Sequence, residues 1–281
     1  MKILFISSIL PFNNSAPWLY VSEIIDNIQK YFNNYNCEYF FWFLAKDNIA
    51  FKNLNNNLKD NYKINYIKKI RFSIFDYLFT LPYKKNYYNS DLANDLVKYI
   101  KNISPDYIIF TNLPSAVYID DIRIKYSQNI KFILIAHNVE YIVEKEFSRF
   151  GKNIFQKLYH YITKNKIKSF EKKVLNNVDF IICISKNDAI YFNNIYKINK
   201  NKLFIIPFLY LFPKNLYNNN IYNKQKQIIS FIGTMDWYPN IQGVIFFVKE
   251  VLPKLLKVFP NLEFYIVGRN PIKKLLKYKY K

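Results

Sequence analysis

The stretch from Ile228 to Gly268, IISFIGTMDWYPNIQGVIFFVKEVLPKLLKVFPNLEFYIVG, decides the fold class of this chain. The apolar runs at its two ends, IISFI and EFYIV, have the length of buried strands. Between these runs, apolar residues recur at helical spacing, at Val244, Val248, Leu252, Leu255 and Phe259. A strand, a helix and a second strand in this order predict a parallel βαβ unit.

The same alternation of strand and helix patterns runs along the rest of the chain. We predict strands at Ile3–Ser7, Glu38–Leu44, Ile64–Ile67, Tyr107–Thr111, Phe132–Ala136, Phe180–Ile184, Leu203–Ile206, Ile228–Ile232 and Glu263–Val267. A helix between the first two strands is predicted by the spacing of Val21, Ile24, Ile28 and Phe32. Several of these strands are apolar on both faces, which is typical of parallel sheets between helix layers. The fold class is therefore α/β, with parallel sheets of the doubly wound type.

The alternation is interrupted once, from Pro207 to Gln227. This run, PFLYLFPKNLYNNNIYNKQKQ, has two prolines, an asparagine cluster and no sustained period, which is typical of a linker. We predict a first domain over residues 1–211, a linker over 212–226 and a second α/β domain over 227–281.

The net charge of +21 raises the question of a nucleic-acid or membrane partner. Lysine, asparagine, isoleucine, tyrosine and phenylalanine are over-used together, and all five have A/T-rich codons. The lysines are spread along the whole sequence, and no Arg-rich helix, zinc-ligand spacing or RNA-binding aromatic motif accompanies them. We therefore expect a solvated basic surface and no nucleic-acid partner, while peripheral contact with anionic lipid stays open.

Two cysteines and the absence of a long apolar run bear on the compartment. Cys37 and Cys183 each lie in an apolar run that reads as a buried strand, so a disulfide framework is not expected. Charged residues interrupt every apolar run before the ~18 residues that a membrane span needs. We read the start, MKILFISSIL, as a strand rather than a signal peptide. The expected location is the cytoplasm, with the inner membrane face as a peripheral site.

Three residues stand directly after predicted strands, where ligands bind in parallel α/β sheets. Gly233 ends ISFIG, Gly268 ends FYIVG, and His137 follows FILIA. The glycines are compatible with ordinary turns or with close approach of the backbone to a phosphate. A lone histidine is often structural, but its place at a strand end favours a polar role toward a ligand. No GxGxxG or Walker loop, HExxH, cysteine-rich metal spacing or glycosidase carboxylate pair is present.

Four runs together resemble glycosyltransferase family 4, the "group 1" glycosyltransferases with a GT-B double-Rossmann fold. They are ILFISSILPF (3–12), AHNVEY (136–141), FEKKVLNNVDFIICISKND (170–188) and IGTMDWYPNIQGVIFFVKEVLPKLLKVFPNLEFYIVGRNP (232–271). The resemblance implies retaining transfer from a UDP- or GDP-sugar to a saccharide or lipid-linked acceptor, without a metal or other cofactor. It implies a complete first domain on the acceptor side and a second, donor-binding domain.

The resemblance also assigns candidate site residues. His137 matches the family histidine that contacts the donor sugar, here the candidate catalytic residue. Gly233 and Thr234 match the loop that cradles the pyrophosphate, and Gly268 and Arg269 match the next loop, near the nucleotide. Thr234 and Asn240 stand where relatives carry Arg and Lys. Asn14 and Ser15 stand in NNSAP, the counterpart of the acceptor-side Gly-Gly loop.

The family's acidic E-x7-E motif and its ribose-binding glutamate are expected after Pro271, and the sequence ends at Lys281. We therefore expect a partial second domain and no turnover by this chain alone. The main hypothesis is a glycosyltransferase of surface polysaccharide synthesis. The alternative is a non-catalytic module that binds a partner protein or an anionic membrane, with the basic and aromatic run 63–85 as its contact.

Overall fold

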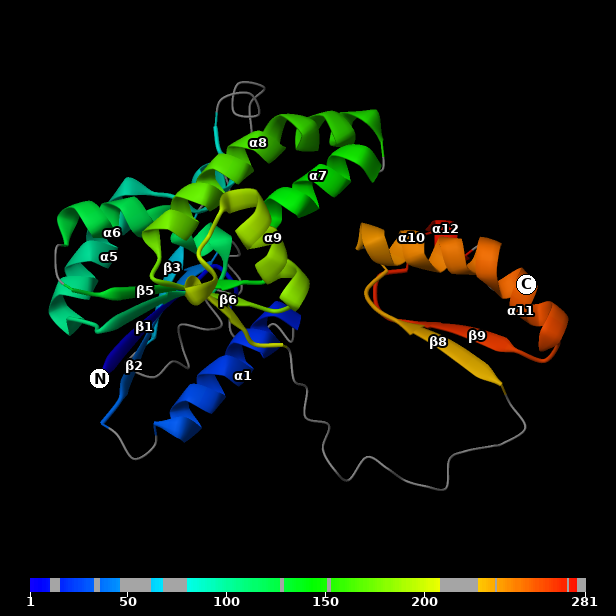
Figure 1. The fold of residues 1–281 in the computed structure, drawn as a ribbon, viewed down its shortest axis with the longest axis horizontal. Coiled ribbons are helices and arrows are strands. Elements are labelled where there is room, and N and C mark those ends of the chain that lie inside the picture. Colours follow the sequence, from blue (N-terminus) through cyan, green and yellow to red (C-terminus); the bar gives the residue numbers. More distant parts are fainter. Residues whose placement is uncertain are drawn as a thin grey trace. The chain divides into compact units, whose positions relative to one another are not determined.

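The computed structural model describes residues 1–10, 16–32, 36–45, 62–67, 80–126, 129–150, 153–207, 227–235, 237–271 and 273–276. The chain divides into two compact units, Met1–Leu209 and Tyr210–Lys281. Both units combine a parallel sheet with helices, which confirms the predicted α/β class (Figure 1). The predicted linker at 212–226 lies outside the described residues, as does most of the run 63–85.

The first unit is built on a seven-stranded parallel sheet with the order β3-β2-β1-β4-β5-β6-β7. Its strands are β1 (Lys2–Ser7), β2 (Glu38–Ala45), β3 (Tyr62–Tyr66), β4 (Tyr107–Phe110), β5 (Lys131–Ala136), β6 (Phe180–Cys183) and β7 (Leu203–Ile205). The order reverses between β1 and β4, whose Ile3 and Tyr107 are paired in register. In open parallel sheets this reversal marks the usual ligand-binding position.

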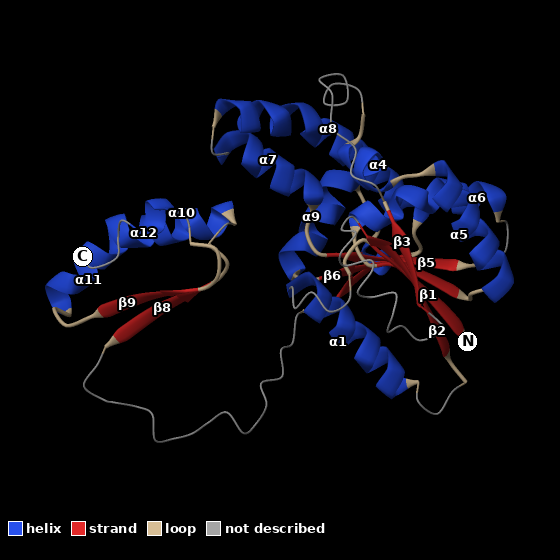
Figure 2. Cartoon of the chain, turned by 180° about the vertical axis from the view of Figure 1, so that it is seen from behind, coloured by secondary structure: helices blue, strands red, loops and turns tan. Residues whose placement is uncertain are grey.

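Both faces of this sheet are covered by helices, as Figure 2 shows from behind. The neighbours Leu4 and Phe5 point to opposite faces, and both are buried, with 0% and 1% exposure. One face packs against α1 (Ala16–Tyr31). The other packs against α5 (Ser90–Ile103), α6 (Ile119–Lys125), α8 (Ile154–Asn177) and α9 (Lys186–Tyr196). The remaining helical segments are α4 (Pro82–Tyr87), η1 (Leu113–Tyr118), α7 (Glu140–Phe150) and η2 (Lys200–Lys202).

All nine strands predicted from the sequence are present, with bounds that differ by at most two residues. The expectation for the cysteines was right for Cys183, which is buried in β6, and wrong for Cys37. Cys37 precedes β2 and is only half-buried, because the β2 ladder begins at Glu38, whose amide donates to the Met1 carbonyl. No helix in the described part of the chain is long and apolar enough to cross a bilayer.

The second unit is a parallel βαβ unit formed by residues 228–268, as their sequence pattern predicts. Its elements are β8 (Ile228–Ile232), α10 (Tyr238–Phe246), the π-helical turn η4 (Phe247–Val251), α11 (Leu252–Val258), β9 (Glu263–Val267) and α12 (Lys273–Leu276). The π turn lies just before Pro253, which has no N–H to donate to the carbonyl four residues back. The amide of Leu252 bonds instead to Phe247, five residues back.

The helices of this unit cover one face of the two-stranded sheet. Met235, Ile241, Val244 and Leu275 form its small core. Ile232 lies on the other face and is 79% exposed. Among the predicted helix positions, Val244 is buried but Phe259 is 43% exposed, because the helix ends at Val258.

We predict that Gly268→Ala destabilises the second unit. A Cβ at Gly268 would lie 1.7 Å from the backbone oxygen of Gly233, so one of the two loops has to move. Overpacking of this kind typically lowers the free energy of unfolding by ~1–3 kcal/mol, and by more where the backbone has to move. Hydrogen exchange measured by mass spectrometry should show faster exchange in β8 and β9.

Gly243→Ala is the matched control for this substitution. A Cβ at Gly243 meets only Phe231, at 3.7 Å, which is an ordinary contact. Because Gly243 lies inside α10, alanine should stabilise the helix by ~0.5–1 kcal/mol. Equal exchange in the two variants would show that the loops do not approach each other as described.

Candidate functional site

Polar side chains gather where β1 and β4 end, at the reversal of the strand order. Ser7 ends β1, and its hydroxyl accepts a hydrogen bond of 2.7 Å from Thr111, which follows β4. The next residues of the two strands, Ser8 and Asn112, are also hydrogen-bonded, at 2.8 Å. These bonds join the carboxyl ends of β1 and β4 into one polar edge, called here the carboxyl edge.

His137 follows β5 and extends this edge. Its Nε2 lies 2.8 Å from the backbone oxygen of Thr111. Because a carbonyl oxygen only accepts, Nε2 carries the proton, and Nδ1 of the neutral ring is an acceptor. Burial lowers the pKa of His137, against the smaller opposing effect of this hydrogen bond. His137 is therefore a neutral imidazole with a fixed orientation at neutral pH.

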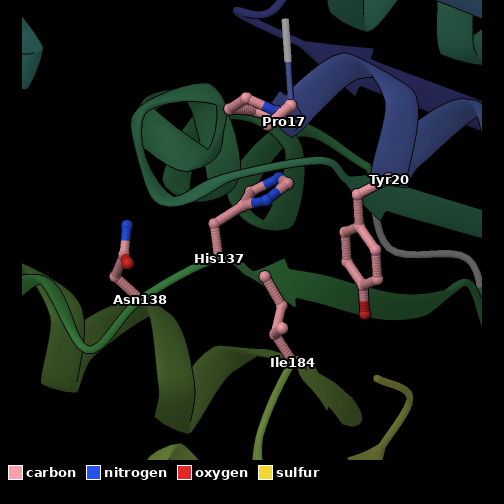
Figure 3. A pocket seen from close by; sticks show the side chains of 6 residues that line it. Pro17, Tyr20, His137, Asn138 and Ile184 are labelled. Atoms are coloured by element: carbon pink, nitrogen blue, oxygen red, sulfur yellow. The ribbon is translucent and has the colours of Figure 1, made fainter. Parts of the chain in front are cut away.

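A cavity of about 260 Å³ opens beside His137. It is lined by Ala16, Pro17, Tyr20, His137, Asn138 and Ile184. In Figure 3 the His137 ring points toward Pro17 and Tyr20 of α1, Ile184 follows β6 below the ring, and Asn138 lies on the other side of His137. The cavity thus combines one polar wall with an apolar one, which is the usual composition of a small-molecule site.

Tyr20 fixes the apolar wall. Its ring meets the His137 ring edge to face, with centroids 5.5 Å apart. Its hydroxyl donates a hydrogen bond of 2.5 Å to the carbonyl of Ile206, directly after β7. Burial raises the pKa of Tyr20 to about 12, so the side chain is a neutral phenol. Tyr20 therefore holds α1 against both the end of β7 and the site histidine.

A buried carboxylate fixes the start of α7, three residues after His137. Glu171 of α8 accepts hydrogen bonds from the backbone amides of Glu140, at 2.8 Å, and Tyr141, at 3.2 Å. The hydroxyl of Tyr196 also donates to it. These bonds satisfy amides that the first turn of a helix leaves without intrahelical partners. The loop that carries His137 is thereby anchored to α8.

Two carboxyl groups behind His137 have raised pKa values. Burial raises the pKa of Glu171 to about 7, although the hydrogen bonds from Tyr196 and the two amides favour its charged form. Burial also raises the pKa of Glu140, which is hydrogen-bonded to the Tyr83 hydroxyl and to the Asn138 side chain. Burial therefore favours the neutral form of both carboxyl groups, and Asn138 links this pair to the cavity.

In the second unit, the two predicted glycines lie in contact at the carboxyl ends of β8 and β9. The amide of Gly233 donates to the carbonyl of Val267, and the Gly233 oxygen occupies the space that a Cβ at Gly268 would need. The packing of the two loops against each other thus explains both glycines. The structure brings together the residues assigned to the donor loops, and their contact with a phosphate remains a prediction.

The other donor-side residues flank these glycines. The Asn240 side chain donates a hydrogen bond of 2.9 Å to the carbonyl of Thr234, so it shapes the loop from the first turn of α10. Arg269 is exposed, and its carbonyl accepts from the amide of Met235 at 2.8 Å. The arrangement leaves the Arg269 guanidinium on the surface at the carboxyl end of β9.

Sequence reasoning identified His137 but missed most of the residues around it. Asn14 and Ser15 lie outside the described residues, and Ala16 and Pro17, which directly follow them, line the cavity. Ser7, Thr111 and their neighbours could have been found by the same pattern as His137, a polar residue at the end of an apolar strand. Tyr20 and Ile184 had no such signal, because only the tertiary fold brings α1 and β6 together here.

Comparison with known proteins identifies the class of this fold and site. Sucrose-phosphate synthase from Thermosynechococcus elongatus has a similar fold, with a TM-score of 0.59 and 13% identity over 99% of this chain and 72% of that one. TarM has a TM-score of 0.53 and 11% identity over 99% and 73%. Both likenesses show the fold, which is that of the GT-B glycosyltransferases.

Residues 56–208 match the model of Glycosyltransferase Family 4, so the chain belongs to this family and is a glycosyltransferase. The match lies in the first unit and includes β5, His137 and Glu171. Among curated proteins, no sequence matches the chain.

We predict that protonation of His137 costs stability in mild acid. The pKa of His137 in the folded protein lies below the ordinary value of 6.5. The contribution of the neutral ring to the free energy of unfolding is therefore fully present above pH 6.5 and is lost as the pH falls from 6.5 through the folded pKa. The melting temperature should fall more from about pH 7 to about pH 5 in the wild type than in His137→Gln, whose amide can still donate to Thr111. Circular dichroism melts measure this, and equal pH dependence would contradict the assignment.

Proposed function

We propose that this glycosyltransferase moves a sugar from a UDP- or GDP-sugar to a saccharide or lipid-linked acceptor in surface polysaccharide synthesis. The transfer retains the anomeric configuration and uses no metal. The observation that carries the proposal is the neutral, fixed His137 beside a cavity at the carboxyl edge of the sheet. The family to which the chain belongs supports the same chemistry.

His137 would contact the donor sugar. With Nε2 donating to the Thr111 carbonyl, the Nδ1 lone pair can accept a hydrogen bond from a sugar hydroxyl. Burial keeps the ring neutral, so no positive charge competes with this acceptor role. The apolar wall made by Pro17, Tyr20 and Ile184 would pack against the sugar ring and limit the access of water.

The loops after β8 and β9 would hold the diphosphate. Gly233, Thr234 and Gly268 would offer backbone to it, and Asn240 would keep the first loop in shape. The amides at the start of α10 and the guanidinium of Arg269 are the positive groups of this unit that favour a phosphate. They would stabilise the negative charge that grows on the leaving diphosphate.

We place the protein in the cytoplasm, at the inner face of the membrane, where lipid-linked acceptors would be reached. The net charge of +21 supports contact with an anionic surface, at about 1 kcal/mol for each well-placed Lys or Arg.

Sugar-nucleotide binding tests the proposal. Titration calorimetry with UDP- and GDP-sugars should show binding, and Arg269→Ala should weaken it about tenfold or more, since a hydrogen bond to a charged group contributes about 1.5–3 kcal/mol. Lys254→Ala removes the same charge from α11 of the same unit and should leave the affinity unchanged. Equal losses in the two variants would reject Arg269 as a donor contact.

The same titrations separate catalysis from the alternative of a non-catalytic module, which has no reason to bind either nucleotide sugar. The absence of binding to both classes would contradict the proposed donor. Turnover is a separate measurement, with a lipid extract as acceptor. Turnover near one per second, within the usual enzyme range, would contradict the sequence-based expectation that these 281 residues are inactive alone.

A further inference from the structure

The helices α7 and α8 form a hairpin whose two arms are joined by specific contacts. The Glu144 carboxylate of α7 lies 2.7 Å from Nδ1 of His160 and accepts a hydrogen bond of 3.1 Å from Thr163, both on α8. The rings of Phe147 and His160 stack, with centroids 4.9 Å apart. In both Figure 1 and Figure 2 the hairpin extends away from the sheet of its unit. Its inner face is thus fixed, and its far end is presented to the surroundings.

The far end of the hairpin is apolar and exposed. Five large side chains there are more than half exposed: Phe150 (63%), Ile154 (70%), Phe155 (80%), Leu158 (54%) and Tyr161 (61%). We call these five residues the hairpin tip. The four on α8 follow the spacing i, i+1, i+4 and i+7, so they share one face of the helix. That face points away from the buried Thr163 and Ile167. Exposed apolar groups gathered in this way indicate a contact surface.

On α8 the charges that border the apolar face are positive, while on α7 the exposed Arg149, beside Phe150, is paired with Glu146 at 3.7 Å. The helix α8 carries six lysines and one acidic residue, and that acidic residue, Glu171, is buried. By helical spacing, Lys157, Lys164 and Lys168 lie along one border of the apolar face. The Nζ atom of Lys164 is 3.8 Å from the centre of the Tyr161 ring. A cationic border therefore adjoins the apolar face directly.

We propose that the hairpin tip docks on an anionic lipid bilayer. Apolar side chains that enter the boundary between headgroups and acyl chains, with lysines at the level of the lipid phosphates, are the pattern of interfacial helices. A second copy of this chain is disfavoured as the occupant, because a net charge of +21 on each copy opposes contact through a basic surface. The lysine border favours an anionic partner because the charges attract, and the five apolar side chains favour a partner whose apolar interior can bury them.

This docking names the surface that would make the membrane contact of the proposed function, and it rests on that placement, but it does not need a sugar nucleotide. It also has a consequence for the proposed transfer reaction. The base of the hairpin, at Glu140, lies three residues after His137, and the tip lies at the other end of the 11-residue helix α7. The docked hairpin would therefore hold the His137 cavity roughly 16 Å from the membrane surface, and the saccharide of a lipid-linked acceptor would have to span that distance.

Vesicle flotation tests the proposal with the full chain. Vesicles of phosphatidylcholine with phosphatidylglycerol should bind the protein, and pure phosphatidylcholine should bind it much more weakly. Phe155→Ser with Leu158→Ser should lower binding at least tenfold, because it removes two apolar side chains from the interface. Both residues are exposed, so circular dichroism should show an unchanged fold. The control pair, Ile190→Ser with Tyr191→Ser, removes two apolar side chains that are 45% and 44% exposed from α9, away from the tip, and should bind normally.

A second pair of variants tests the cationic border. Lys157→Gln with Lys164→Gln should lower binding to the anionic vesicles about tenfold, because neither side chain can then pair with a lipid phosphate. Lys98→Gln with Lys101→Gln removes the same charge from the exposed side of α5 and should have little effect. Equal reductions in the two pairs would mean general adsorption of a basic protein and would overturn the proposal.

Three further results would also overturn it. One is the absence of vesicle binding. Another is a change of oligomeric state in the Phe155 and Leu158 variant, measured by light scattering, which would assign the tip to a second copy. The third is weak oxidation of the Phe155 and Leu158 side chains by hydroxyl radicals without vesicles, which would show that another part of this chain covers the tip. Loss of vesicle binding with sugar-nucleotide binding intact separates failure of the docking surface from failure of the proposed function.

Discussion

The burial of both faces of one parallel sheet is the constraint on which the rest of the first unit depends. With Leu4 and Phe5 each enclosed by a different helix layer, no face of β1 is left for polar chemistry. Polar side chains can therefore stand only where the strands end, and all the strands of a parallel sheet end at the same edge. Ser7, Thr111 and His137 meet at the carboxyl edge for this reason, although they are far apart in the sequence.

This constraint also explains what could be predicted from the sequence. Strands buried on both faces are continuous apolar runs, and β8 and β9 are also apolar runs although only one face of their sheet is covered by helices. All nine strands were therefore found, with errors only at their ends. The burial expected for Cys37 was wrong because the hydrogen-bonded ladder of β2 begins at Glu38, one residue later. His137 could be found because it interrupts an apolar run. Tyr20 could not, because its contact with His137 depends on how α1 packs across the sheet.

The glycines show how one sequence signal can have two physical causes. Gly233 and Gly268 suggest close backbone approach, and the sequence alone does not say what approaches. The structure shows that the two loops approach each other, so both residues have a structural reason to be glycine. Asn240, which the family resemblance assigns to a cation position, donates a hydrogen bond to the carbonyl of Thr234. The loops are therefore shaped by contacts within the protein, and the proposed role of Arg269 toward a phosphate rests on its charge and exposure.

One carboxyl group, that of Glu171, connects the loop beside the cavity with the exposed hairpin of α7 and α8. Glu171 lies on α8, and its bonds to the amides of Glu140 and Tyr141 determine where α7 begins. His137 lies three residues before that point, and its ring is held by Thr111. A shift of α8 along its axis would thus act on both the exposed hairpin tip and the loop beside the cavity. Burial raises the pKa of Glu171 to about 7. The charged carboxylate accepts more strongly from both amides than the neutral carboxyl group does, so the connection is strongest when Glu171 is deprotonated. The surface that we assign to the membrane and the histidine that we assign to the sugar are in this way connected through the hydrogen bonds of Glu171.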